Sequence, residues 1–514
     1  MTIGAPPDDA ALARFGYRQE LHRTMGRYAS FAAGFSFISV LTTVFQFFGF
    51  GYAFAGPAFT WTWPAVFAGQ LLVAACFAEL AARYPLSGAI YQWSTRLSTP
   101  AFGWFAGWIM VIGQILVVAA AALALQVVLP GIWSGFQVVG GDPAPTAPTG
   151  AANAGLLGVL LLTLTTLVNV VDNRVLSAVN RIGVTAEIVG AVLIVVLLLT
   201  HTRHGLGVTL HTGAGGGAPG ALMVGAFAAA YVLIGFDSAG EMSEETRSPR
   251  RTAPRTILTA LVAAGVLGGL LVYAGVLASP DLGSERMTSE GLAYVLTSSL
   301  GPGIGKALLA DVVVAVFVAT LAIQTAGTRM LFSMARDGAL PFAHRLGRVS
   351  ARTGMPAVAA LVTGTGAAGL CLLNFLSPNA FVAIGTTCVA MVYLAYAMVT
   401  GPFLVQRLRR GHGAAETAGV TDERGGRLFS LGRWGVPVAA AALVYGLAMT
   451  VDLAWPRPAV YDPSGGHWYF QWFTVLFLGA TLLAGAACRR LRHRGRAGLP
   501  AAERAPSLTQ APTP

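Results

Sequence analysis

The chain has 514 residues, of which 55% are hydrophobic and only 11% are charged, and its mean hydropathy is +0.65. Because a soluble domain carries about 25% charged residues, this composition excludes one soluble core and indicates a bundle of membrane-spanning helices. The net charge of +11 is spread over many connections, whereas a nucleic-acid-binding protein gathers its charge on one face. We therefore expect a lipid bilayer, and no nucleic acid, as a partner.

The reactive residue types show no catalytic or metal-binding pattern. The four cysteines, Cys76, Cys371, Cys388 and Cys488, lie in or beside apolar runs without the spacing of metal ligands, which is typical of small buried hydrophobic residues. The histidines fall in connections or at the ends of runs, and no nucleophile–base pair is evident. We expect no enzymatic activity, no metal site and no cofactor. The polar first residues contain no apolar core, so no cleaved signal peptide is predicted.

Twelve apolar runs of about the length that crosses a bilayer predict an all-α polytopic membrane protein. They lie at 30–55, 62–82, 101–129, 154–171, 182–200, 219–237, 256–278, 304–332, 357–375, 380–404, 435–453 and 470–488. Residues 28–490 thus form the predicted twelve-span domain. Residues 1–27 form a cytoplasmic N-terminal segment, and residues 491–514, rich in proline and alanine, form a cytoplasmic tail that we expect to be disordered.

The distribution of arginine predicts the orientation. One set of connections, including both ends of the chain, holds most of the arginines. The opposite set holds only Arg203, Arg286, Lys306 and Arg457. Since basic residues favour the cytoplasmic side, both termini are predicted to be cytoplasmic in a multi-pass protein of the cell membrane. An even number of spans requires the same arrangement.

The segment 235–257, GFDSAGEMSEETRSPRRTAPRTI, interrupts the sixth apolar run. Gly235 breaks the run, and acids follow at Asp237, Glu241, Glu244 and Glu245. A glycine-interrupted apolar helix is typical of a discontinuous transporter helix with its binding site at the break, and acids within a span mark pathways or hinges. The alternative is that the helix ends at Gly235 and a charged loop follows.

Three segments together resemble the amino acid-polyamine-organocation permeases. The first is the sixth-span segment just described. The second is ELAARYPLSGAIYQW (79–93), followed by AFGWFAGW (101–108), and the third is TRMLFSMARDGALP (328–341). Their order and spacing are those of the family, over roughly residues 25–490. The resemblance is closest to the branch that contains γ-aminobutyrate, choline and general amino-acid permeases.

The resemblance implies two inverted repeats of five helices, the fold of leucine-transporter-type proteins, followed by two further helices. Spans one and six would be broken at mid-membrane beside the substrate. The implied substrate-binding residues are Ser39, Leu41, Thr42, Thr43, Gly235, Phe236 and Asp237. Where many relatives have a Gly-Ser/Thr-Gly triplet at the span-one break, this chain has Leu41-Thr42-Thr43. The missing glycines make close approach of a substrate carboxylate harder, which leaves room for an ω-amino acid or an amine.

The acids within the spans have alternative roles. Asp237 could face a substrate amine or cap the following helix, and capping is the expectation we favour. Glu244 and Glu245, close to many arginines, are expected to form a structural ion-pair network. Asp311 could line an outer vestibule or pair with Lys306.

Glu187 is the candidate proton-coupling residue, because it lies inside span five where some proton-coupled relatives carry a lysine in place of a sodium ion. A carboxyl at that depth could take up and release a proton near neutral pH. The alternative is a glutamate whose side chain extends to the interface, with Arg181 as its partner.

These features predict a secondary active transporter that imports an amino acid or a related amine such as γ-aminobutyrate by alternating access. Protons are favoured over sodium as the coupling cation. The alternatives are an antiporter of amino compounds and a membrane receptor or sensor that does not transport. A twelve-span facilitator built from two six-helix halves is disfavoured, because the longest cytoplasmic connection follows span ten and not span six.

Overall fold

The computed structural model describes residues 12–171, 173–212, 219–350, 353–410, 426–462 and 465–493. Within these ranges the chain is helical, and its extended pairing is limited to one isolated parallel bridge between Met25 and Thr246. The tail predicted to be disordered lies outside the described residues from position 494 onward, as do the first eleven residues of the predicted N-terminal segment.

The predicted spans are present as helices with closely matching bounds. The main helices are α2 (Arg27–Ile38), α3 (Val40–Ala55), α4 (Thr62–Arg83), α6 (Pro100–Leu123), α7 (Leu125–Ile132), α8 (Pro148–Val171), α9 (Asn173–Thr200), α10 (Pro219–Val232), α12 (Pro249–Ala278), α15 (Gly301–Arg336), α17 (Ala357–Cys371), α18 (Asn379–Arg410), α19 (Gly435–Ala454) and α22 (Phe473–His493). Several begin or end beyond the apolar run, because an apolar run marks the hydrocarbon-facing length and a helix can continue past it.

Short helices connect these spans. They are α5 (Ala89–Leu97), α11 (Ser238–Glu241), α13 (Arg286–Ser289), α14 (Leu292–Ser299), α16 (Ala343–Leu346), α20 (Pro458–Tyr461) and α21 (Trp468–Gln471), together with the 3₁₀ turns η1 (Gly56–Trp61), η2 (Ser134–Phe136), η3 (Leu206–Leu210), η4 (Ser243–Glu245), η5 (Leu372–Phe375) and η6 (Gly432–Trp434).

Ten stretches of the described chain are long and apolar enough to cross a membrane. The first, Arg27–Arg83, has 57 residues, about 85 Å of helix. That is far more than the roughly 30 Å of a bilayer core, so η1 divides it into two spans, α2–α3 and α4. The 14-residue helix α10, continued by α11, supplies another span. The described residues therefore make twelve passes, as predicted.

The order of elements repeats after five spans. In each half the first span is broken, as α2–α3 and as α10–α11, and the second span, α4 or α12, is continuous. Short helices then precede the third span, namely α5 before α6, and α13 with α14 before α15. Since five is an odd number, the second repeat crosses the membrane in the opposite sense to the first, which is the arrangement of an inverted-repeat transporter.

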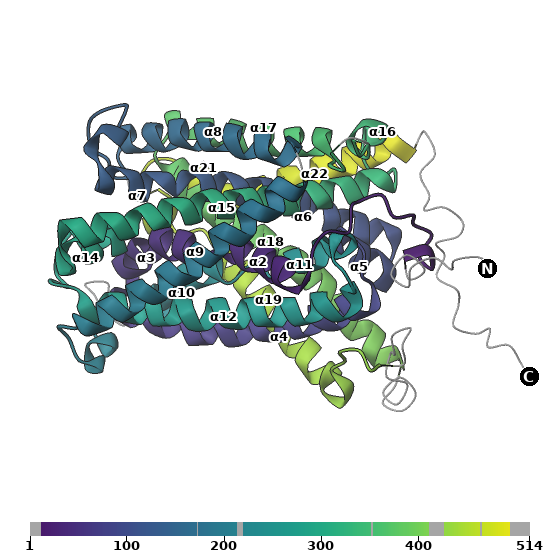
Figure 1. Cartoon of the computed structure of the whole chain (residues 1–514), viewed down its shortest axis with the longest axis horizontal. Coiled ribbons are helices and arrows are strands. Elements are labelled where there is room, and N and C mark those ends of the chain that lie inside the picture. The colour runs from purple at the N-terminus through teal and green to yellow at the C-terminus, as the bar shows by residue number, and fades with distance from the viewer. Residues whose placement is uncertain are drawn as a thin grey trace, which may run out of the picture.

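The broken spans lie within the bundle, while the last two helices lie at its edge. In α18, 83% of the most apolar stretch of 18 residues is buried inside the bundle. The same fraction is 28% in α19 and 17% in α22. Figure 1 shows the long helices running side by side, with α5 and α16 toward one end and α14 toward the other. We call these the α5 end and the α14 end. The five-plus-five core with two peripheral helices thus agrees with the predicted fold.

The α5 end is closed by buried ion pairs that join the three sequence segments singled out above. Glu244 accepts from the Arg336 guanidinium at 2.7 and 2.8 Å and from the Ser87 backbone N–H at 3.0 Å. Glu245 accepts from Arg329 Nε at 2.6 Å, and both of these side chains are almost fully buried. The predicted ion-pair network is therefore present, and two of its arginines come from α15, which is distant in the sequence.

A second ionic cluster ties α4 to α18 at the same end. Glu79 is fully buried and pairs with Arg83 and Arg407. Its carboxylate also accepts from the backbone N–H of Leu431 at 2.8 Å. The first repeat, the second repeat and the connection after α18 are thus held together at one acid.

These pairs lead to a prediction about stability. In Glu245→Gln the buried Arg329 guanidinium loses its counter-ion, which is expected to cost about 3–5 kcal/mol. The matched control is Glu290→Gln, which breaks the exposed pair with Arg286 and is expected to cost less than about 1 kcal/mol. Thermal unfolding of both variants in detergent gives the comparison. Equal midpoints for the two variants would contradict the structural role of the buried pair.

Candidate substrate and coupling site

Span one is broken at Ser39, between α2 and α3. Ser39 has φ 38°, a left-handed conformation that costs a residue other than glycine about 1–3 kcal/mol. Leu41, Thr42 and Thr43, which were predicted to form the break, lie instead in the first turn of α3. The break is two residues earlier because Thr43 continues the helix. Its hydroxyl donates to the Ser39 carbonyl at 2.7 Å and its N–H to the same oxygen at 3.0 Å.

The carboxylate of Glu187, on α9, lies over this break. Its Oε1 is 2.9 Å from the Ser39 hydroxyl and accepts from the Leu41 backbone N–H at 3.3 Å. The Ser39 hydroxyl is also 2.7 Å from that of Thr42. A carboxylate at a helix N-terminus is stabilised by the free N–H groups and by the helix dipole. Glu187 therefore occupies the kind of position that a substrate carboxylate would take.

The Glu187 side chain does not extend to the membrane interface, which was the alternative predicted from the sequence. The side chain of Glu187 is fully buried, and Arg181 donates to the Ser177 carbonyl at 3.3 Å. Asp311, on α15, is the acid that interacts electrostatically with Glu187. It packs so closely on Gly190, one turn along α9, that a Cβ at Gly190 would overlap its carboxylate.

Neither predicted role of Asp311 is seen among the described contacts. Among the described contacts it forms no ion pair with Lys306, and it does not line the cavity at the α14 end. Its Oδ2 is buried without a described hydrogen-bond partner. Two carboxyl groups, Asp311 and Glu187, therefore face the same stretch of α9 and α15.

Span six is broken between Val232 and Ser238. Gly235 adopts φ 94°, which glycine tolerates and other residues rarely do. A Cβ at Gly235 would overlap the ring of Phe37 in α2. The ring of Phe236 packs on Phe77 of α4 and on Tyr396 of α18, with centroids 5.8 and 5.2 Å away. The two breaks are therefore adjacent, with α2 packed directly against the backbone of the second break.

Asp237 does not cap α11, contrary to the role that we favoured from the sequence. Its side chain makes no capping hydrogen bond. Instead it accepts from the Tyr396 hydroxyl, which in turn accepts from the Gly235 backbone N–H at 3.0 Å. The Asp237 carboxylate is engaged by the tyrosine, and in the first turn of α11 the N–H groups of Gly240 and Glu241 donate to the Asp237 backbone carbonyl instead. Sequence reasoning missed Tyr396, whose only signal was a hydroxyl in the middle of an apolar span.

A second buried acid, Glu241, lies one turn beyond Asp237. Both side chains are fully buried and interact electrostatically. Gln114 of α6 donates to Glu241 Oε1 at 2.8 Å, while Oε2 of Glu241 and Oδ2 of Asp237 have no described partner. Two buried carboxylates that interact electrostatically repel each other when both are ionised. The cluster therefore favours a bound cation or a proton.

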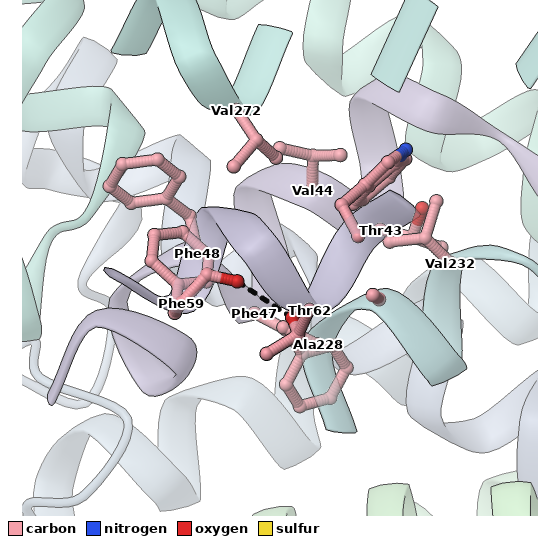
Figure 2. Close-up of a pocket in the computed structure, with 11 residues that line it drawn as sticks. Thr43, Val44, Phe47, Phe48, Phe59, Thr62, Ala228, Val232 and Val272 are labelled. Carbon is pink, nitrogen blue, oxygen red and sulfur yellow. Dashed lines mark hydrogen bonds between the residues drawn. The ribbon is translucent and has the colours of Figure 1, made fainter. Parts of the chain in front are cut away.

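A small cavity lies where α3 crosses α10, on the α14 side of the breaks. Figure 2 shows Thr43 among its lining side chains, most of them apolar, including Val44, Phe47 and Val232. Its volume is only about 10 Å³, about the space of one water molecule, so this cavity is too small for a substrate in the conformation described.

A larger cavity of about 340 Å³ lies farther along α3 toward the α14 end, and its lining includes Phe50, Phe54 and Phe381. Phe47 lines both cavities. Its ring centroid is 4.9 Å from that of Phe227 and 4.4 Å from that of Tyr231. A layer of aromatic rings therefore separates the small cavity from the larger one, while buried ion pairs close the α5 end.

Comparison with known proteins agrees with this architecture. The amino acid permease family matches residues 29–479. The chain is 26% identical to the amino-acid permease BAT1 of Arabidopsis thaliana, with 88% of each chain covered. It is also 26% identical to amino-acid permease 2 of Neurospora crassa, with 93% of this chain and 87% of the relative covered. The thiamine transporter thi9 of Schizosaccharomyces pombe is 24% identical over 93% of this chain and 84% of its own length.

The family match spans most of the chain and includes both broken spans and every segment on which the resemblance was based. A permease moves its substrate across the membrane without making or breaking a covalent bond, so the protein is a transporter and not an enzyme. With its twelve passes and its paired helix breaks, this chain belongs to the amino acid permease family.

Proposed function

We propose that the protein imports an amino acid or a related amine, with γ-aminobutyrate as a candidate, and that a proton on Glu187 drives the import. The observation that carries this proposal is the contact of the Glu187 carboxylate with Ser39 and with the Leu41 N–H. The relatives are named for amino acids and for thiamine, which supports a substrate that carries an amine or another cationic nitrogen.

Competition for the first turn of α3 supplies the coupling. An ionised Glu187 holds the N–H groups that a substrate carboxylate needs, and a hydrogen bond to a charged acceptor is about twice as strong as one to a neutral acceptor. Protonation weakens this hold and releases the N–H groups to the substrate. Proton and substrate therefore bind together, and loss of the proton after opening to the other side expels the substrate.

The other end of the substrate has a partner at the second break. An ammonium group between Asp237 and Glu241 would meet the two carboxylate oxygens that lack described partners. A longer separation of carboxylate and amine suits an ω-amino acid better than an α-amino acid.

The direction of transport follows from the orientation. The α5 end is expected to face the cytoplasm, because the connections at that end carry most of the arginines. With ion pairs closing the α5 end and a cavity reaching toward the breaks from the α14 end, the conformation suits loading from outside.

The coupling proposal predicts a change in pH dependence. As the pH rises, Glu187 ionises and competes with the substrate, so the affinity of the wild type should fall. Glu187→Gln imitates the protonated state and should bind substrate with little dependence on pH. It should exchange substrate for substrate but lose accumulation driven by a pH gradient. Uptake and counterflow in proteoliposomes, with and without sodium, measure both.

Glu285→Gln, which removes an exposed acid at the α14 end, is the matched control and should behave like the wild type. Accumulation that needs sodium and ignores the pH gradient would contradict proton coupling. Substrate exchange without net accumulation under any gradient would indicate an antiporter, and binding without either process would indicate a sensor.

A separate prediction concerns the amine. Asp237→Asn and Glu241→Gln keep the shape of each side chain but remove its charge, so each should weaken substrate affinity by about 1.5–3 kcal/mol, the value of a charged hydrogen bond. A panel of γ-aminobutyrate, choline, ethanolamine and α-amino acids tests this. Unchanged affinity in both variants would remove the substrate amine from the second break.

The orientation can be tested by labelling. Cysteine replaces Asp142, an exposed residue between α7 and α8, or Phe342, which is 71% exposed between α15 and α16. In a Cys488→Ser background, a membrane-impermeant maleimide should label Asp142→Cys in intact cells. It should label Phe342→Cys only after permeabilisation. The reverse pattern would invert the predicted topology.

A further inference from the structure

A basic cavity at the α5 end lies outside the transport pathway. It has a volume of about 370 Å³ and lies between the start of α2 and the start of α12. Its lining consists of Arg27, Tyr28, Phe31, Arg251, Thr252, Arg255, Thr256 and Thr259. Three of these described lining residues are arginines and none is acidic, so the cavity has the charge of an anion-binding site.

The helices that carry these arginines are packed against each other. Arg251 and Arg255 lie one turn apart on the same face of α12, and Arg27 faces them from the first turn of α2. The two helices meet at Ser30 and Thr256, whose hydroxyl oxygens are 3.3 Å apart. Tyr28 contacts α9 through a 2.6 Å hydrogen bond with Thr185. Arginine forks arranged on a rigid frame are suited to the oxygens of a phosphate group.

The same face of α12 continues as an exposed apolar stripe. Val262, Val266 and Leu270 follow Thr259 at helical spacing and are 43%, 53% and 47% exposed. The stripe covers eight residue steps, or about 12 Å of helix, close to the depth of one leaflet of a bilayer whose core is about 30 Å thick. A soluble anion would contact only the basic cavity, whereas a phospholipid can contact the cavity with its headgroup and the apolar stripe with an acyl chain.

We propose that the cavity of Arg27, Arg251 and Arg255 binds the phosphate headgroup of an anionic phospholipid, whose acyl chain lies along Val262, Val266 and Leu270. Basic pockets between spanning helices are suited to such headgroups. The bound lipid joins α2, the first half of the broken span one, to the continuous helix α12. It should therefore stabilise the folded protein.

The experiment uses the full-length protein in neutral detergent. Thermal unfolding is followed while phosphatidylglycerol, phosphatidylcholine or soluble glycerol phosphate is added. Phosphatidylglycerol should raise the midpoint, and the other two should not. In the double variant Arg27→Gln/Arg255→Gln, the phosphatidylglycerol concentration for half of the shift should rise at least about tenfold, because each arginine near the surface contributes appreciably to binding an anionic lipid.

The control Arg345→Gln/Arg348→Gln removes two exposed arginines from the connection around α16 at the same end and should respond like the wild type. An equal response of the two double variants would overturn the site. An equal shift with glycerol phosphate would show a soluble-phosphate site and overturn the lipid assignment.

If the first double variant does not fold, Arg255→Gln and Val266→Gln are tested singly. Val266→Gln should weaken the response to the lipid, and no change in either single variant would also overturn the proposal.

Discussion

Two helices that break in the middle of a membrane-spanning bundle leave backbone N–H and C=O groups without intrahelical partners, where water cannot satisfy them cheaply. This constraint organises the centre of the protein. At the first break the Glu187 carboxylate accepts from Leu41, and Thr43 donates back to the Ser39 carbonyl. At the second break the Tyr396 hydroxyl accepts from Gly235. Each break therefore has an N–H group that donates to a side chain of a continuous helix, α9 or α18, so movement of that helix must change the hydrogen bonds of the broken one.

The α5 end has a different task. Its ion pairs close the bundle, and in a transporter they would have to separate when that end opens. Glu244, Ser87 and Arg336 meet there, although they are far apart in the sequence. Ser333 adds a 2.7 Å bond to the Ser87 carbonyl. A buried ion pair contributes little net stability but is costly to break on one side only. Such a closure should resist partial opening and separate as a unit, which suits a transporter that must keep one end sealed at a time.

The limits of sequence prediction follow from the same physics. The spans, their order and the break at Gly235 were predictable, because hydrophobic length and a glycine in an apolar run are local signals. The exact break of span one was not, since Ser39 adopts a left-handed conformation with no glycine to mark it. The partners of the acids were equally hidden. Glu187 meets a backbone N–H 146 residues away, and Asp237 meets a tyrosine 159 residues away. These contacts depend on how helices cross, and a single sequence does not encode that in any short pattern.

In the proposed mechanism, Ser39 connects proton coupling to the conformation of the first break. Its left-handed backbone is unfavourable by itself, and the contact of its hydroxyl with Glu187 at 2.9 Å helps to hold it. When Glu187 takes up a proton, this support weakens at the same time as the N–H groups of α3 become available. A substrate carboxylate that binds there replaces the lost acceptor, whereas an empty protonated site leaves the strained residue poorly supported. The protonated carrier is therefore expected to favour the substrate-bound state over the empty one. In the proposed mechanism, one carboxylate thus links proton binding, substrate binding and the geometry of the first break, with no need for a separate relay between them.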